Sequence, residues 1–110
     1  MIQAIHCNQL YSETTIFSQG IVADEFTFLA ADARQRDGSA HDGSAASECG
    51  QALETLHSAL TSCGQDLQNL VSLTVFLADY TDTADIIGAL HSQLDPSGTP
   101  AITFVGVSAL

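Results

Sequence analysis

The sequence has no lysine and only two arginines, Arg34 and Arg36, against thirteen acidic residues. Its net charge of −11 repels the phosphate backbones of nucleic acids, which proteins neutralise with several Lys or Arg side chains acting together. We therefore expect no nucleic-acid partner. Because lysine is absent, the chain itself cannot form a Schiff base or attach pyridoxal phosphate.

Cysteine is scarce too, and its spacing does not suit metal or disulfide chemistry. Cys7, Cys49 and Cys63 are odd in number and lack a C-x-x-C spacing, so neither a disulfide framework nor a thiolate metal cage is indicated. This usage fits a reducing cytoplasm. The histidines show no paired ligand spacing, and we expect no metal site from them: His6, His41, His57 and His91.

Long apolar runs are also missing. The longest apolar stretches fall well short of the ~18 residues of a membrane-spanning helix, and the opening segment MIQAIHCNQL lacks a basic start followed by an apolar run. We expect neither a membrane-spanning nor an exported protein. A chain of 110 residues that is 45% hydrophobic fits one modest core, and we predict a single domain over residues 1–110.

The first half of the chain contains a predicted hairpin. Residues 16–23 and 26–33 are rich in aromatic and β-branched side chains around the polar pair Asp24-Glu25, which indicates two strands joined by a tight turn. The polar stretch 34–44 follows, with two Asp-Gly pairs that favour turns. We predict a loop there.

Two amphipathic helices are predicted further along. In residues 45–63 apolar side chains recur every three or four positions, and Gly64 marks the end: Cys49, Leu53, Leu56, Leu60 and Cys63. Asp82 is predicted to cap a shorter helix that Pro96 stops, with the apolar stripe Ile86, Ile87, Leu90 and Leu94. Residues 69–79 and 101–107 are predicted strands, the first of them covered on both faces. Such an order predicts an α+β or α/β sheet with helices packed on it.

Five segments together match a known family. They are FSQGIV (17–22), FTFLAAD (26–32), QALETLHSAL (51–60), TVFLAD (74–79) and PAITFVGV (100–107). In this order and at these spacings, the chain resembles the RidA/YjgF family, the reactive intermediate deaminases of the Rid superfamily. The resemblance covers nearly the whole chain.

The resemblance implies a chorismate-mutase-like α+β fold, with a mixed sheet, two helices on one of its faces, and the order strand-strand-strand-helix-strand-helix-strand. It also implies a homotrimer with ligand clefts between neighbouring subunits. The implied substrates are small enamines or imines that carry a carboxylate and are hydrolysed to keto acids and ammonia without a cofactor. That reaction needs a cation for the carboxylate, backbone groups that polarise the C=N bond, and an oriented water.

At the positions that align with the family's site, this chain departs from the family pattern. Phe17 replaces a tyrosine, Ala30 and Ala31 replace a serine and a glycine, Ile102 replaces the carboxylate-binding arginine, and Phe104 replaces a small polar or thiol side chain. Losing hydrogen bonds to a charged carboxylate forfeits about 1.5 to 3 kcal/mol for each one. These five residues therefore predict an apolar cleft, suited to an uncharged ligand or to none. An alternative is that Arg34 or Arg36 reaches the cleft from the loop.

The family's final strand lies inside the sheet, between the segments written here as FTFLAAD and TVFLAD, and it carries the glutamate thought to orient water. That strand would fall beyond Leu110. We expect that the sheet closes differently, that another chain or segment completes it, or that these residues belong to a longer chain.

Two functional hypotheses follow. In the first, a cytoplasmic RidA-type homotrimer binds or converts a small organic molecule at subunit interfaces, with enamine or imine hydrolysis as the chemistry if it is an enzyme. In the second, it is a non-catalytic ligand-binding or assembly subunit. RNA cleavage, the activity given for some relatives, is disfavoured by the charge of −11.

Overall fold

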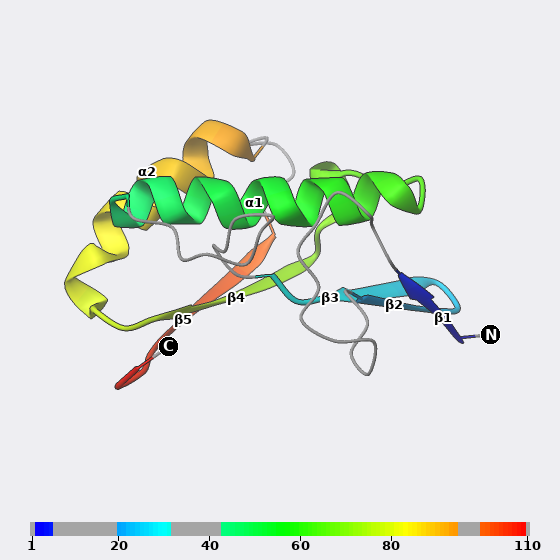
Figure 1. The fold of residues 1–110 in the computed structure, drawn as a ribbon, viewed down its shortest axis with the longest axis horizontal. Coiled ribbons are helices and arrows are strands. Elements are labelled where there is room, and N and C mark those ends of the chain that lie inside the picture. The colour runs from blue at the N-terminus through cyan, green and yellow to red at the C-terminus, as the bar shows by residue number, and fades with distance from the viewer. Residues whose placement is uncertain (1, 6–19, 32–42, 95–99, 110) are drawn as a thin grey trace.

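The computed structural model describes residues 2–5, 20–31, 43–94 and 100–109. In chain order its elements are β1 (Ile2–Ile5), β2 (Gly20–Ala23), β3 (Phe26–Leu29), α1 (Ala45–Ser62), η1 (Leu67–Asn69), β4 (Ser72–Leu77), η2 (Tyr80–Asp82), α2 (Thr83–Gln93) and β5 (Ala101–Gly106). Figure 1 shows α1 and α2 on one side of the strands. The predicted α+β class, with helices on one face of the strand layer, is confirmed.

The strands pair in two groups. β1, β2 and β3 form an antiparallel sheet, whereas β4 and β5 pair in parallel, from Ser72 opposite Ala101 to Leu77 opposite Gly106. The predicted hairpin is present, because β2 and β3 are joined through Asp24, whose positive φ of 54° suits a tight turn. The parallel pair is joined through α2, the usual crossover between parallel strands.

α1 follows the predicted periodicity closely. Its N-terminus is capped by Ser44, whose side chain accepts a hydrogen bond from the backbone N–H of Ser47 at 3.2 Å. At its C-terminal end Cys63 is the cap residue, and Gly64 takes the left-handed conformation with φ 81°, which only glycine adopts without cost. The helix therefore ends where the sequence predicted.

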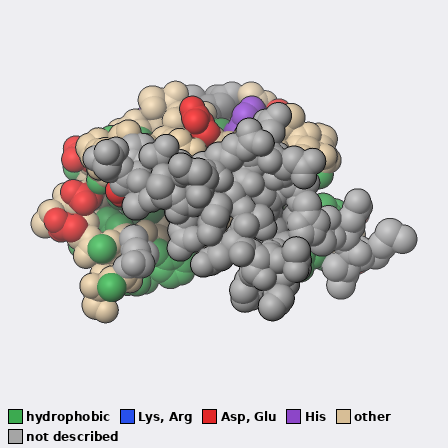
Figure 2. Space-filling model, viewed as in Figure 1, with side chains coloured by type: hydrophobic (Ala, Val, Ile, Leu, Met, Phe, Trp, Pro, Cys, Tyr) green, Lys and Arg blue, Asp and Glu red, His purple; other side chains and the backbone are tan. Residues whose placement is uncertain are grey.

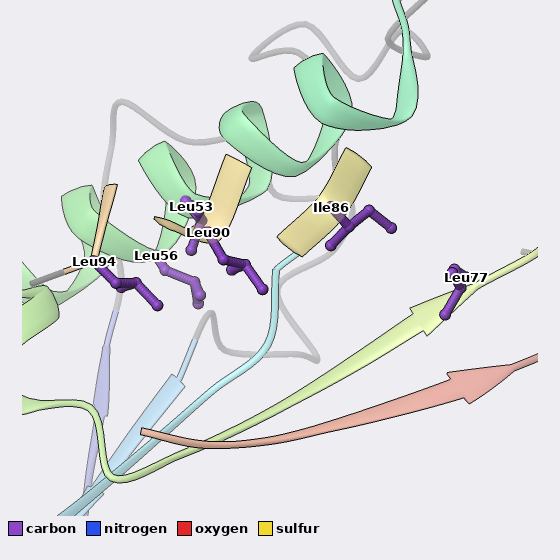
Figure 3. Packing of buried hydrophobic residues seen from close by; sticks show 6 residues of the cluster. All are labelled: Leu53, Leu56, Leu77, Ile86, Leu90 and Leu94. Carbon is purple, nitrogen blue, oxygen red and sulfur yellow. The ribbon is translucent and has the colours of Figure 1, made fainter. Parts of the chain in front are cut away.

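The core lies between the two helices and the strands. Its buried side chains are Leu53, Leu56, Leu77, Ile86, Leu90 and Leu94, drawn in Figure 3. Five of these six side chains come from α1, α2 and the cap residue that follows α2, and Leu77 comes from the end of β4. Burying a leucine or isoleucine stabilises a fold by roughly 1.5 to 3 kcal/mol. The helix pair therefore supplies most of this core.

Two local predictions are wrong. β4 is not covered on both faces in this chain, because Phe76 is 57% exposed on the side away from the helices. Asp82 does not cap α2, since its side chain makes no cap hydrogen bond. Asp79 caps instead, and it does so for η2, the short helix that leads into α2. Sequence spacing alone did not reveal this extra turn.

Other boundaries are shifted or lie outside the described residues. α2 ends at Gln93, before the predicted stop at Pro96, which lies outside them, as does the loop prediction for 34–42. β2 is described from Gly20, inside the predicted strand 16–23, and β3 ends at Leu29, earlier than the predicted strand 26–33, because Ala30 and Ala31 are described and lie outside it. Residues 101–106 form β5 as predicted.

Candidate ligand and assembly surface

The strand layer has one face that meets the helices. Along β4 and β5 alternate side chains point to this face, as expected for a period of two. Side chains that are partly buried there pack against the helix-centred core: Leu29, Leu73, Val75, Ile102 and Phe104. This face is thus part of the hydrophobic interior of the protomer.

The opposite face is open and apolar. Ile21 on β2, Phe26 and Phe28 on β3, and Phe76 on β4 are 39%, 61%, 63% and 57% exposed. Ile21 is directly opposite Phe28, and Phe26 lies two residues away on the same strand, so these three side chains share one side of the hairpin. Leu29 points to the other side of the hairpin, toward the core, so Ile21, Phe26 and Phe28 lie on the side away from the helices. We call these four residues the open face.

The residues predicted to bind a ligand fall in different surroundings. Ile102 and Phe104 lie two positions apart on β5, on the helix-facing side, and both pack against the core. Ala30 and Ala31 are exposed and directly follow β3. Leu29, the residue before Ala30, packs against the same core as Ile102 and Phe104, which brings the end of β3 into that layer. Phe17 lies outside the described residues, as do Arg34 and Arg36.

The carboxyl ends of β4 and β5 meet a short polar turn. There the Asp79 carboxylate accepts hydrogen bonds from the side-chain hydroxyl of Thr81 at 2.6 Å and from its backbone N–H at 3.0 Å. These bonds hold the pKa of the Asp79 carboxyl below its ordinary value, because they stabilise the charged form. The ring of Tyr80 lies above Gly106, where an added Cβ would be 3.5 Å from Cδ2 of Tyr80. Asp79 thus has a local structural role at this turn.

The charges in the described residues are almost entirely negative. Figure 2 shows several acidic side chains and one histidine, and no Lys or Arg belongs to the described part of the chain. Among those residues, no group of three or more His, Cys, Asp or Glu side chains is placed to hold a metal ion. Within the same ranges, no helix is both long and apolar enough to cross a membrane.

Cys49 is a free thiol on α1. Partial burial against the core raises its pKa, because desolvation disfavours the thiolate. The thiolate is the reactive form, so this cysteine is poorly suited to act as a nucleophile. It belongs to the apolar stripe on which the sequence placed it.

A layer of paired strands with two helices on one side, and exposed apolar side chains on the other, defines an α+β protein. The family profile described as Endoribonuclease L-PSP matches residues 7–110, and the chain belongs to this family. Its membership confirms the predicted RidA/YjgF resemblance. None of the curated protein sequences matches this chain.

Solved structures agree on the fold. A Yersinia pestis protein of the conserved Rid family, YyfA, is 19% identical and superimposes with a TM-score of 0.93, over 100% of this chain and 89% of that one. The yeast protein YEO7 is 21% identical with a TM-score of 0.91, over 100% of this chain and 88% of that one. RidA from the Antarctic bacterium Psychrobacter sp. is 20% identical with a TM-score of 0.89, over 98% of this chain and 88% of that one.

Proposed function

We propose that this chain forms a homotrimer of the Rid type and binds a small, uncharged organic molecule between its subunits. The open face supports the trimer, because large aromatic side chains there are more than half exposed in the single chain. The ligand site is a separate part of the proposal, since Ile102 and Phe104 lie on the opposite, helix-facing side. Contiguous exposed apolar patches on soluble proteins usually mark interaction surfaces. Copies of the same chain that cover this face would bury Phe26, Phe28 and Phe76 together.

No charged side chain of the open face opposes contact between copies of the chain. The open face consists of apolar side chains, and the other residues that share its side of β4 are Ser72 and Thr74, so no charge is buried when copies meet there. The net charge of −11 on each copy repels its neighbours over longer distances. Salt screens such repulsion beyond a Debye length of about 10 Å at 0.1 M. We therefore expect the assembly to strengthen as ionic strength rises.

The ligand site is expected to lack a carboxylate-binding cation. Ile102 stands where the family pattern has its arginine, and the described residues contain no Lys or Arg. Burying a ligand carboxylate beside isoleucine without a partner is costly. The predicted lining of Phe17, Ala30, Ala31, Ile102 and Phe104 therefore suits a neutral ligand. If the protein turns its ligand over, hydrolysis of a neutral imine or enamine is the reaction that fits.

A non-catalytic role is the second candidate, and the placement of Ile102 favours it. Its side chain packs against the core together with Phe104, so β5 presents hydrophobic packing where the family pattern has a polar group. A ligand-binding or assembly subunit needs no general acid or base at that place. RNA cleavage, the activity in the family's description, is not part of the proposal, because the charge of −11 disfavours binding to a phosphate backbone. The cytoplasm stays the expected location, because the number and spacing of the cysteines indicate no disulfide framework.

An activity assay separates the two candidates. The protein is incubated with 2-aminoacrylate generated in situ and, in parallel, with a neutral imine of similar size. Keto-acid release from 2-aminoacrylate is expected at the uncatalysed rate, whereas faster carbonyl release from the neutral imine would support the enzymatic candidate. Background rates with both compounds favour the non-catalytic subunit. Clear acceleration with 2-aminoacrylate would contradict the proposed neutral site.

Substitution at Ile102 sharpens this assay. Ile102→Arg is expected to confer measurable binding of pyruvate, because a guanidinium forms two charge-assisted hydrogen bonds to a carboxylate. Ile102→Val is the matched control, which keeps the site apolar and is expected to bind no pyruvate. Circular dichroism checks that both variants stay folded. Light scattering at micromolar concentration tests the assembly, and a monomeric mass for the unmodified chain contradicts the trimer.

A further inference from the structure

Tyr80 is a large exposed side chain near the carboxyl ends of the parallel strands β4 and β5. Its side chain is 57% exposed, and it begins η2, the short helix between β4 and α2. Tyr80 does not belong to the open face, and it is not among the five residues predicted to line the ligand site. A tyrosine ring offers both a large apolar surface and a hydrogen-bonding group to another molecule.

The ring of Tyr80 lies on the same side of the sheet as the proposed ligand site. A Cβ built on Gly106 would be 3.5 Å from Cδ2 of Tyr80 and 3.9 Å from its Cβ and Cγ. Side chains alternate along β5, so a side chain at position 106 would point to the side on which Ile102 and Phe104 pack. The Tyr80 ring therefore continues the row formed by Ile102 and Phe104.

Gly106 leaves the place beside this ring open. Gly106 is itself exposed, and the three heavy atoms nearest to its Cβ position all belong to Tyr80. Glycine in a strand often marks a place where a ligand approaches the backbone closely. An incoming molecule can thus contact the Tyr80 ring and the backbone of β5 at the same time.

The spacing along β5 suits a flat molecule. Side chains two residues apart on one face of a strand are separated by about 7 Å. A flat group that contacts a ring on each of its faces needs about 7 Å as well, because carbon atoms in contact lie about 3.5 to 4.0 Å apart. The separation between the Phe104 position and the Tyr80 ring over Gly106 therefore matches one aromatic or conjugated layer.

Hydrogen bonds hold the backbone on both sides of Tyr80. Its C=O accepts a hydrogen bond from the Thr83 hydroxyl at 2.6 Å and another from the Thr83 backbone N–H. The C=O of Asp79 accepts from the N–H of Asp82 at 3.1 Å, and the Asp79 carboxylate accepts from Thr81. A binding group on a fixed backbone loses little freedom when a ligand arrives.

The Tyr80 hydroxyl is the polar group beside Gly106. Within the described ranges, Tyr80 accepts hydrogen bonds through its backbone C=O, and its hydroxyl has no partner. A tyrosine hydroxyl usually takes a partner once it is buried. The neighbouring Asp79 is charged at neutral pH, because the hydrogen bonds from Thr81 hold its pKa below the ordinary value. A neutral ligand with a hydrogen-bonding group is therefore favoured over a carboxylate.

We propose that Tyr80 is a ligand-contact residue, whose ring packs against a flat, uncharged ligand above Gly106 and whose hydroxyl hydrogen-bonds to a polar group at the edge of that ligand. The inference rests on the proposed ligand site at Ile102 and Phe104, and it adds the class of ligand. That class is a neutral aromatic or conjugated molecule with a carbonyl or imine group. Phe104 contacts its apolar part, and Tyr80 contacts its polar end.

Fluorinated probes test the ligand class on the full chain. Fluorine NMR follows the binding of para-fluorobenzamide, and the amide signals of the protein locate the contact. We expect saturable binding, with shifted signals at Tyr80, Thr81 and Gly106 and an unshifted signal at Val71, which is exposed before β4. The non-planar cyclohexanecarboxamide is expected to compete about tenfold more weakly, because it cannot stack on a ring. The charged para-fluorobenzoate is expected to bind about tenfold more weakly too.

Matched variants of Tyr80 separate the ring from the hydroxyl. Tyr80→Phe is expected to weaken para-fluorobenzamide binding about fivefold, because one hydrogen bond is lost. It should leave the binding of para-fluorotoluene unchanged, since that probe makes no such bond. Tyr80→Ala is expected to weaken both probes about tenfold. A residue that only supports the fold would not change the preference between the probes. Val71→Ala is the control and should bind both like the unmodified chain.

Gly106→Val tests the open place beside the ring. Its Cβ would be at an ordinary contact distance from Tyr80, so the chain is expected to fold. The two added methyl groups occupy the place of the ligand, and saturable binding of both probes should be lost. Gly106→Ala adds the Cβ alone and is expected to lose less. Circular dichroism and light scattering show whether each variant keeps its fold and its assembly.

Three results overturn the inference. Unchanged affinity in Tyr80→Ala, with shifted amide signals at Ile102 and Phe104, would remove Tyr80 from the site and leave the proposed neutral ligand site intact. Equal binding of cyclohexanecarboxamide would contradict a flat ligand. Absence of saturable binding for both neutral fluorinated probes would contradict the Tyr80 contact and the neutral ligand site together. The proposed trimer is tested separately by light scattering, because it depends on the open face.

Discussion

The two faces of the strand layer have similar chemistry and opposite surroundings. On the helix side, Leu73, Val75 and Phe104 are covered by α1 and α2 and complete the core. On the open side, Phe28 and Phe76 are equally hydrophobic but more than half exposed. In the single chain, the helices therefore cover only one face of the strand layer. Among the described residues, the other face is left exposed.

The two faces are expected to affect different properties: the helix-covered face the stability of one chain, and the open face its association with other copies. Core side chains hold the helices on the strands and are expected to determine the free energy of unfolding of one chain. Open-face side chains are expected to contribute little to that free energy, because they are solvated, and to contribute much to association in the proposed trimer. Substitutions on the two faces should have different effects, which can be measured.

The largest expected effect belongs to the covered face. Leu53→Ala removes a side chain that is 2% exposed at the centre of the core. It should lower the free energy of unfolding by about 2 to 5 kcal/mol, because transfer and cavity costs add. Denaturant unfolding followed by circular dichroism measures it. Glu54→Ala, the exposed neighbour, is the control, and a similar loss in both variants would contradict the assigned core.

Gly20→Ala tests the close approach of β2 to β3. A Cβ at this buried position would lie 2.7 Å from the carbonyl oxygen of Phe28 and would also overlap the side chain of Leu29. Overpacking of this kind costs about 1 to 3 kcal/mol. Thermal unfolding provides the measurement, with Gly88→Ala on α2 as control, since nothing lies near its Cβ position. An unchanged midpoint for Gly20→Ala would mean that the hairpin does not pack this closely.

Phe28→Ser tests the open face. The free energy of unfolding of the isolated chain should change by no more than about 0.5 kcal/mol, because the side chain is exposed there. The assembled mass measured by light scattering should fall toward that of a single chain. Val71→Ser provides the control, because Val71 is exposed and precedes β4 without belonging to the open face. Unchanged assembly in Phe28→Ser would shift the proposed interface elsewhere.

The smallest expected effect concerns Asp79. Hydrogen bonds from the Thr81 hydroxyl and backbone N–H lower its pKa in the folded chain, so their contribution to stability is present above the unfolded pKa. That contribution is lost as the pH falls through the folded pKa. Thr81→Val removes the hydroxyl and should raise the pKa toward its ordinary value, as measured by NMR titration of the carboxyl. An unchanged pKa would contradict the hydroxyl bond, whereas Thr83→Val should leave it unaltered.

Much of the fold followed from local pattern. The stripe through Leu53, Leu56 and Leu60 predicted α1 to within one residue at its end, because a helix buries one side in any context. Gly64 ended it as expected, since the left-handed turn depends on glycine alone. The hairpin around Asp24 was equally local. Recognition of the family depended on several such segments in order.

Other features depended on distant contacts. In FTFL the residues on both sides of the strand are apolar or nearly so, and the pattern cannot show which of Phe28 and Leu29 meets the helices. The capping role moved from Asp82 to Asp79 because an extra turn, η2, forms before α2. For the predicted ligand residues, the structure adds that Ile102 and Phe104 belong to the packed layer.

The sequence by itself determined the helices, the hairpin, the family and the strong negative charge, because each depends on composition or on neighbours within a few positions. Only the tertiary structure decided which face of the strands the helices cover and which of the described strands pair with each other. Coverage depends on where α1 and α2 pack, and pairing depends on how strands far apart in the chain come together. Local residue preferences do not encode either one.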